Sequence, residues 1–201
     1  YLCECFFNGV PFRWWEPEMD ILFSFVETHL VPRGIIAFNT EKEIVCPDAD
    51  LAGSIDLIVY EPSTGLHHII DFKRSDKLKE QLWGYGKMRA PLTHLDDSKG
   101  ASYALQTSLY QYVLEREYGM TIGERILLSI HPDQPFCTAV PYLKAETEYL
   151  MAQRYALVQA RRVVREAAPE RFTCALTGAP LVDAVTCDDG TNGMEKAAQV
   201  R

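Results

Sequence analysis

The amino-acid sequence predicts an α/β domain with a mixed central β-sheet flanked by helices. β-Branched and aromatic runs separated by turn residues occupy residues 35–46, 55–60 and 67–73, as expected for three sequential antiparallel strands. Apolar residues at helical spacing precede this group over residues 18–30 and follow it from residue 102 onward. Two shorter apolar segments and a final helical pattern complete the order helix, three strands, helix, two strands, helix.

The first helix is expected to end before Pro32 and Gly34, because these residues interrupt helices. Glu27 lies beside its apolar stripe. The strand over residues 35–46 carries Glu41, and Pro47 begins a turn into the next strand.

The second half of the chain begins with a polar, basic stretch over residues 76–88 that is expected to be partly helical. A loop over residues 91–101 follows. Ser102 is the expected N-cap of a helix that runs to Tyr118. Four residues are expected to form the buried stripe of this helix: Leu105, Leu109, Tyr112 and Val113. Strands over residues 126–131 and 137–142 and a helix over residues 144–167 complete the pattern.

The two central strands, joined by the turn Pro62-Ser63-Thr64-Gly65, each carry one carboxylate in apolar surroundings. If the turn centres between Ser63 and Thr64, antiparallel pairing places Asp56 opposite Asp71. Two facing carboxylates destabilise a sheet unless a cation lies beside them. Lys73 shares the face of Asp71 by the strand period and supplies one positive charge, and a divalent metal would supply the rest.

Composition limits the other classes of protein to which the chain could belong. With 201 residues, 47% of them hydrophobic, the chain can bury one full core. No segment approaches the roughly 18 consecutive apolar residues of a membrane span. The first residues lack an initiator Met, so we expect the chain to be part of a larger polypeptide or complex. They also lack the layout of a signal peptide, so we expect an intracellular protein, nuclear or cytoplasmic, and not a secreted one.

The cysteines and the charge of the chain limit which cofactors and partners it could bind. The six cysteines form no CxxC pair and are expected to be reduced thiols, and an iron–sulfur cluster is not expected. The formal net charge of −8 argues against a wholly basic nucleic-acid platform. Residues 73–89 are locally basic, however, and begin at the proposed site.

Three motifs occur in order: Gly53-Ser54-Ile55-Asp56, Ile70-Asp71-Phe72-Lys73, and Gln106 with Tyr110 four residues later on a helix. In this order and context they resemble the PD-(D/E)XK nuclease superfamily, and within it the RecB-like group. The stretch from Thr40 to Arg74 and later segments are also similar to nuclease domains of large DNA viruses and protist mobile elements. The resemblance implies a restriction-endonuclease-like αβββαβ core.

The domain boundaries follow from this resemblance. An irregular N-terminal segment is expected over residues 1–19, the nuclease domain over residues 20–168, and a polar C-terminal tail over residues 169–201. The literal dipeptide Pro47-Asp48 matches the name of the superfamily, but we interpret Asp48 as turn chemistry because it precedes the strand that carries Asp56.

The resemblance implies a metal-dependent nuclease that hydrolyses phosphodiester bonds, with DNA favoured over RNA and the choice between exonuclease and endonuclease open. Such hydrolysis needs a metal that polarises the phosphate and lowers the pKa of a bound water. Mg²⁺ or Mn²⁺ would be held by Asp56, Asp71 and the backbone carbonyl of Phe72. Lys73 would orient the attacking water, help to deprotonate it, or stabilise the charge that develops.

A further acidic ligand is usual in the superfamily, and both Glu41 and Glu27 are candidates, with Glu41 favoured. Gln106 and Tyr110 would hold the DNA backbone or brace Lys73. Two alternatives remain open from the sequence. The first is a cap-snatching-like RNA endonuclease, for which His29 is the residue to probe. The second is a catalytically inactive nucleic-acid or protein-binding module that keeps the nuclease fold.

Overall fold

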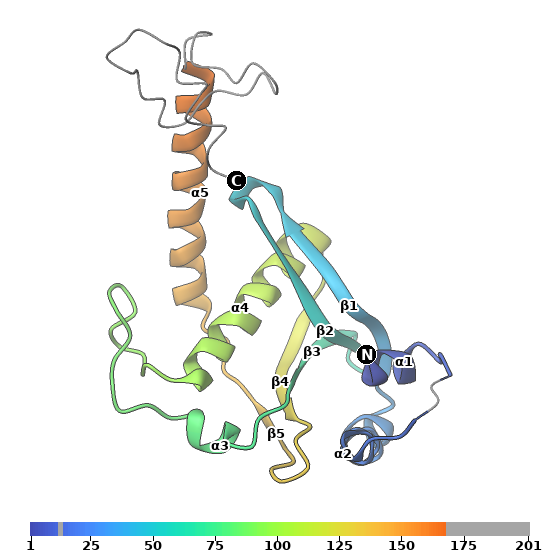
Figure 1. The fold of residues 1–201 in the computed structure, drawn as a ribbon. Helices are drawn as coiled ribbons and strands as arrows, with labels where there is room; N and C mark the ends of the chain where they lie inside the picture. Colours follow the sequence, from blue (N-terminus) through green and yellow to red (C-terminus); the bar gives the residue numbers. More distant parts are fainter. Residues whose placement is uncertain (12–13, 168–201) are drawn as a thin grey trace, which may run out of the picture. The chain divides into compact units, whose positions relative to one another are not determined.

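The computed structural model describes residues 1–11 and 14–167 of the chain. These residues form a five-stranded mixed β-sheet flanked by helices, so the predicted α/β class is confirmed (Figure 1). The elements in chain order are α1 (Leu2–Phe7), α2 (Pro17–Phe25), β1 (Ile36–Cys46), β2 (Leu51–Glu61), β3 (Leu66–Lys73), α3 (Leu78–Gln81), α4 (Lys99–Tyr118), β4 (Ile122–Ser129), β5 (Phe136–Ala139) and α5 (Lys144–Ala167).

The strands lie in the spatial order β1-β2-β3-β4-β5, with every neighbouring pair antiparallel except β3 and β4. The parallel pair is joined through α4, because parallel neighbours need a crossover connection. The predicted register of the central hairpin is confirmed by the pairs from Leu57↔Ile70 to Glu61↔Leu66. This register brings Asp56, in the middle of β2, level with Asp71, near the end of β3.

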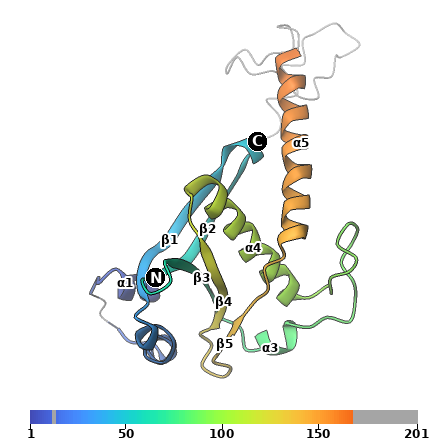
Figure 2. The ribbon, with the colours of Figure 1, turned by 180° about the vertical axis from the view of Figure 1, so that it is seen from behind.

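Helices cover both faces of the sheet, which can be followed from the two sides in Figures 1 and 2. On one face α2 packs against three strands, and the buried side chains of this cluster include Met19, Leu22, Leu57, Ile70 and Leu128. On the other face Ala104 of α4 packs with Leu127 and Val140, and Tyr103 joins this second cluster. Since Asp71 is paired with Leu127, its side chain lies on the α4 face.

Several element boundaries differ from the sequence prediction. The N-terminal segment, expected to be irregular, contains α1, because Leu2 and Phe6 pack against the α2 cluster. The first helix begins one residue early, at Pro17, and continues after α2 as a π-helical segment, Val26–Leu30. β4 and β5 begin before the predicted residues 126 and 137. The expected tail over residues 169–201 lies outside the described residues.

The buried face of α4 was predicted incorrectly. Val113 is buried, but Leu105, Leu109 and Tyr112 are only partly buried. Three polar residues, Thr107, Ser108 and Gln111, are buried instead. Each has a hydrogen-bond partner: Thr107 Oγ1 donates to the Tyr103 carbonyl, Ser108 Oγ accepts from the Leu143 N–H, and Gln111 binds Glu115 and Arg125. Buried polar groups are tolerated when they are paired in this way.

The N-cap of α4 is Ser98 and not the predicted Ser102, since the Ser98 side chain accepts a hydrogen bond from the Ala101 N–H at 3.0 Å. Replacing Ser98 with alanine should lower the free energy of unfolding by about 1 kcal/mol. For a chain of this size the melting temperature should fall by roughly 2–4 °C. Thermal unfolding followed by circular dichroism would measure this. Ser102→Ala is the matched control, and an equal loss in both variants would contradict the assignment of the cap.

The chain divides into two compact units, Tyr1–Met151 and Ala152–Arg201. The sheet, its covering helices and all sites described below belong to the first unit. No helix in the described parts of the chain combines the length and the apolar character needed to cross a membrane.

Candidate functional site

Asp71 and Lys73 lie together at the end of β3, on the face covered by α4. The Lys73 Nζ atom is 2.5 Å from Asp71 Oδ2, and the Asp71 residue is only 4% exposed. Apart from this ion pair, the buried Oδ2 atom has no hydrogen-bond partner. A buried carboxylate oxygen without a hydrogen bond is costly unless a cation compensates it.

The protonation of Asp71 reflects this environment. Burial is the main cause that raises the pKa of the Asp71 carboxyl above its ordinary value, and the nearby charge of Asp56 adds to the effect. Lys73 acts in the opposite direction but does not cancel the rise. More positive charge than Lys73 supplies would therefore stabilise the ionised form of this carboxyl.

Asp56 is held at the point where the central hairpin opens. The β2–β3 ladder ends at Leu57↔Ile70, one residue before the two aspartates. Beyond it, Asp56 Oδ2 accepts a hydrogen bond from the backbone N–H of Phe72 at 2.7 Å. The carboxylate thus replaces a strand carbonyl as the acceptor and is anchored beside Asp71.

Side chains of α4 close the site from above the sheet. The Lys73 Nζ atom lies 4.6 Å from the centroid of the Tyr103 ring, which is within range for a cation–π interaction. Gln106 Nε2 donates to the Tyr110 hydroxyl at 2.8 Å. A Cβ atom on Gly53 would lie 3.2 Å from Tyr110 Cε1, so glycine at this position lets the tyrosine ring approach β2. The three sequence motifs therefore meet in space.

Neither predicted third ligand is grouped with the two aspartates. Glu41 is exposed on β1, with a positive φ of 46°, and Ser54 Oγ donates to its Oε2 at 3.4 Å. Glu27 is exposed in the π-helical segment after α2. Among the described residues, no group of three or more His, Cys, Asp or Glu side chains could hold a metal ion. The identity of a further acidic ligand stays a prediction.

Glu18 is an acidic residue near this edge that the sequence analysis overlooked. It is buried in the first turn of α2, and Arg74 Nε donates to its Oε1 at 2.8 Å. This hydrogen bond is the main cause that lowers the pKa of Glu18. The charges of Asp56 and Glu18 also make small contributions to the raised pKa of Cys3, which is due mainly to burial.

Ser129 is a second residue that sequence reasoning missed. It is fully buried on β4, is paired with Lys73 in the parallel register, and its Oγ atom has no hydrogen-bond partner. Side chains paired in this way lie on the same face. No pattern in the sequence marks this serine, because it ends an apolar strand.

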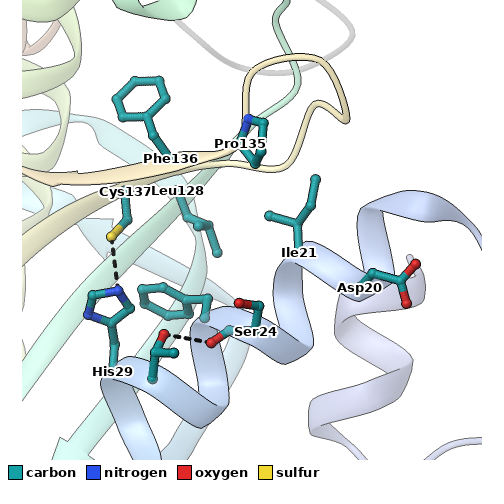
Figure 3. A pocket seen from close by; sticks show the side chains of 10 residues that line it. Asp20, Ile21, Ser24, His29, Leu128, Pro135, Phe136 and Cys137 are labelled. Atoms are coloured by element: carbon teal, nitrogen blue, oxygen red, sulfur yellow. Dashed lines mark hydrogen bonds between the residues drawn. The ribbon is translucent and has the colours of Figure 1, made fainter.

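His29 lies in a different part of the molecule. Its Nε2 atom is 3.4 Å from Cys137 Sγ, and both residues line a pocket of about 320 Å³ between α2 and the start of β5. Figure 3 shows the imidazole directed at the thiol and away from Asp20. The structure does not bring His29 together with the two aspartates.

Comparison with known proteins adds little to this geometry. No protein-family model and no curated protein matches the chain. The solved structures that resemble it include the following two. An exonuclease candidate from Eubacterium rectale is 12% identical, with 79% of this chain and 73% of that chain covered and a TM-score of 0.39. The protein SSO0001 is 16% identical, with 71% and 56% covered and a TM-score of 0.31.

These likenesses are too weak to carry an argument. The chain spans little more than half the length of SSO0001.

Proposed function

We propose that this domain is a Mg²⁺- or Mn²⁺-dependent nuclease that hydrolyses phosphodiester bonds, with DNA as its substrate in preference to RNA. The observation that carries the proposal is the buried Asp71 carboxylate, whose Oδ2 atom is paired with Lys73 alone among the described residues and whose pKa is raised by burial and by the nearby charge of Asp56. A salt-bridged structural pair alone gives no reason for a second carboxylate to be anchored nearby.

The donor atoms fit a hard divalent cation. Asp56 and Asp71 offer only oxygen, which Mg²⁺ and Mn²⁺ prefer over sulfur or nitrogen. Mg²⁺ retains several waters and is commonly bound through one or two carboxylates, so the absence of a third acidic group among the described residues is compatible with its binding. The bound ion would polarise the phosphate and lower the pKa of a coordinated water. The Phe72 carbonyl is the remaining proposed ligand.

The other residues of the site have separate roles in this proposal. Lys73, 20% exposed and held between Asp71 and the Tyr103 ring, is positioned to orient a water and to stabilise negative charge on the phosphate. The Gln106–Tyr110 pair offers polar groups to the DNA backbone at the β2 side. Arg74 and Glu18 form an ion pair directly after Lys73, which would help to fix the end of β3.

Metal binding is the first test. Calorimetric titration should detect Mn²⁺ binding by the wild-type protein. The Asp56→Asn variant should bind Mn²⁺ at least about tenfold more weakly, because loss of a residue that supports a metal site typically lowers the metal affinity 10–100-fold. Asp48→Asn is the matched control, since Asp48 belongs to the turn before β2 and should not affect binding.

Two outcomes of this titration would contradict the proposal. They are a wild-type protein that binds no Mn²⁺ and an Asp56→Asn variant that binds it unchanged. Either result would favour the catalytically inactive module. A panel of single- and double-stranded DNA and RNA, tested for Mg²⁺-dependent cleavage, decides the substrate, and preferential cleavage of RNA would favour the cap-snatching-like alternative.

A further inference from the structure

Two aromatic side chains stand in solvent on the loop that joins α3 to α4. Trp83 is 79% exposed and Tyr85 is 113% exposed, which makes them the most exposed large hydrophobic residues in the described part of the chain. We call this pair the aromatic platform. Exposed apolar side chains that lie together, unlike those scattered singly, mark candidate binding surfaces.

The loop that carries the aromatic platform is well connected to the rest of the domain. A Cβ atom on Gly84 would lie 2.3 Å from the Asp97 carbonyl oxygen, and one on Gly100 would lie 2.3 Å from the Leu82 carbonyl oxygen. The segment is further tied by a bridge and an ion pair between Lys87 and Asp96, with 2.6 Å between Nζ and Oδ1. Backbone therefore fills the inner side of the loop, and the two rings remain outside.

A pocket lies next to the platform. Trp83 and Lys87 line a space of about 440 Å³ whose other walls include Ala101 at the start of α4 and Ala139 of β5. A planar group stacked on Trp83 would have room beside the ring.

The chain segment that leads from the candidate site to the platform is locally basic, although Asp96 and Asp97 lie against its loop. Between residues 73 and 89 there are six basic residues and two acidic ones, whereas the chain has a formal net charge of −8. The basic residues are Lys73, Arg74, Lys77, Lys79, Lys87 and Arg89. This distribution fits a phosphate backbone, because binding to nucleic acid depends mainly on neutralisation by Lys and Arg.

Packing connects the platform to the candidate site. Leu82, directly before Trp83, packs against the same cluster as Tyr103. The Tyr103 ring in turn lies 4.6 Å from Lys73 Nζ. A strand that leaves the site along the basic segment would therefore run toward the aromatic platform.

We propose that Trp83 and Tyr85 stack on unpaired bases of a DNA strand and so direct single-stranded DNA to the Asp56, Asp71 and Lys73 site. This inference rests on the proposed nuclease function and adds the form of the substrate. Bases in a duplex are stacked on each other, whereas unpaired bases leave a face free for an aromatic ring. Basic residues beside such rings are the usual arrangement of single-strand binding surfaces.

The experiment measures binding by fluorescence anisotropy in EDTA, so that no cleavage occurs. The probes are a labelled oligothymidine longer than the roughly 4–16 nucleotides that single-strand sites cover, and a duplex of the same length. Trp83→Ala and Tyr85→Ala should each weaken single-strand binding by about 5- to 100-fold. Duplex binding should change by less than about twofold, since duplex contacts are to phosphates.

Two control variants separate stacking from other effects. Trp83→Phe keeps a ring and should retain most of the affinity for the oligothymidine. Tyr149→Ala removes a half-exposed aromatic residue on α5 and should change neither affinity. Circular dichroism should be unchanged in all four variants, because Trp83 and Tyr85 are exposed.

Several results would overturn the proposal. One is an unchanged single-strand affinity in the Trp83→Ala, Tyr85→Ala double variant. Another is a loss of duplex affinity equal to the loss of single-strand affinity, and a third is a wild-type protein that binds neither probe.

Tighter binding of a matched oligouridine through the same rings would assign the platform to RNA. Cleavage measured separately with Mg²⁺ distinguishes the two proposals: cleavage without ring-dependent binding refutes the platform alone, and ring-dependent binding without cleavage refutes the nuclease alone.

Discussion

Replacing Lys73 with alanine should reduce Mg²⁺-dependent DNA cleavage by about 10²–10³-fold, which is the usual cost of removing one group that stabilises charge in a transition state. Lys73 is the only cation within ion-pair distance of Asp71 in the described residues, and its Nζ atom is fixed by the Tyr103 ring as well. The rate of cleavage of a labelled DNA under single-turnover conditions is the measurement. Lys144→Ala, an exposed lysine on α5, is the matched control and should cleave like the wild type.

Asp71→Asn should reduce the rate of cleavage about as much as Lys73→Ala does. It should not destabilise the metal-free protein. The pKa of Asp71 is raised in the folded state from its ordinary value of 3.8. A raised pKa means that the folded state favours the protonated acid, so stability is lost as the pH rises through the folded pKa and the carboxylate ionises. Asparagine imitates the protonated acid and avoids this loss. In metal-free buffer near pH 8, Asp71→Asn should therefore melt at the same temperature as the wild type or higher.

The combination of lost activity and retained stability is the informative result. Undiminished cleavage by Lys73→Ala and Asp71→Asn would refute the proposed nuclease site. A marked drop in the melting temperature of Asp71→Asn at pH 8 would show that the ion pair with Lys73 is structural, which would favour the inactive module.

The central hairpin could be predicted from sequence because its signals are local. Pro62 and Gly65 form the turn, with Gly65 at a φ of 73° that suits glycine, and mostly apolar strands lie on both sides. A slip by one residue would move every buried side chain to the opposite face. The turn and the apolar pattern therefore set the register, and the register brings Asp56 near Asp71.

The features that could not be predicted depend on partners far away in the chain. Ser108 can be buried because its hydroxyl accepts a hydrogen bond from the Leu143 N–H. Glu18 can be buried because Arg74, 56 residues later, donates to its carboxylate. No local pattern of apolar residues contains this information. The same reason explains why Glu18 was not considered as an acidic neighbour of the site and why the choice between Glu41 and Glu27 is still a prediction.

Glu61→Ala should destabilise the domain more than most single changes outside the core, lowering the melting temperature at pH 7 by roughly 5 °C or more. Glu61 ends β2, and its carboxylate accepts hydrogen bonds from Arg33 at 3.0 and 3.1 Å and from Thr64 at 2.9 Å. Its backbone carbonyl accepts from Gly65 in the turn. Removing the carboxylate takes away the acceptor of Arg33 Nε, Arg33 Nη2 and Thr64 Oγ1 beside the turn that sets the hairpin register. Differential scanning calorimetry measures the change, and Glu43→Ala, on the exposed side of β1, is the control.

The pH dependence of unfolding tests the same contacts. Hydrogen bonds from Arg33 and Thr64 lower the pKa of Glu61 to about 2, from an ordinary value of 4.5. A lowered pKa contributes stability that is present above the ordinary value and is lost as the pH falls through the folded value. The wild-type protein should therefore lose more stability than Glu61→Gln between pH 4.5 and about 2. Parallel curves for the two proteins would contradict the assignment.

Because Glu61 is the last residue of β2, at the turn and five residues from Asp56, its replacement should affect stability without affecting the site directly. At a temperature where Glu61→Ala is still folded, its Mn²⁺ affinity should equal that of the wild type within about twofold, as expected for distant and independent sites. A much weaker affinity would mean that the turn must hold the register tightly for Asp56 and Asp71 to bind a metal together. The hairpin would then be one cooperative unit in which the turn residues and the two aspartates cannot be varied separately.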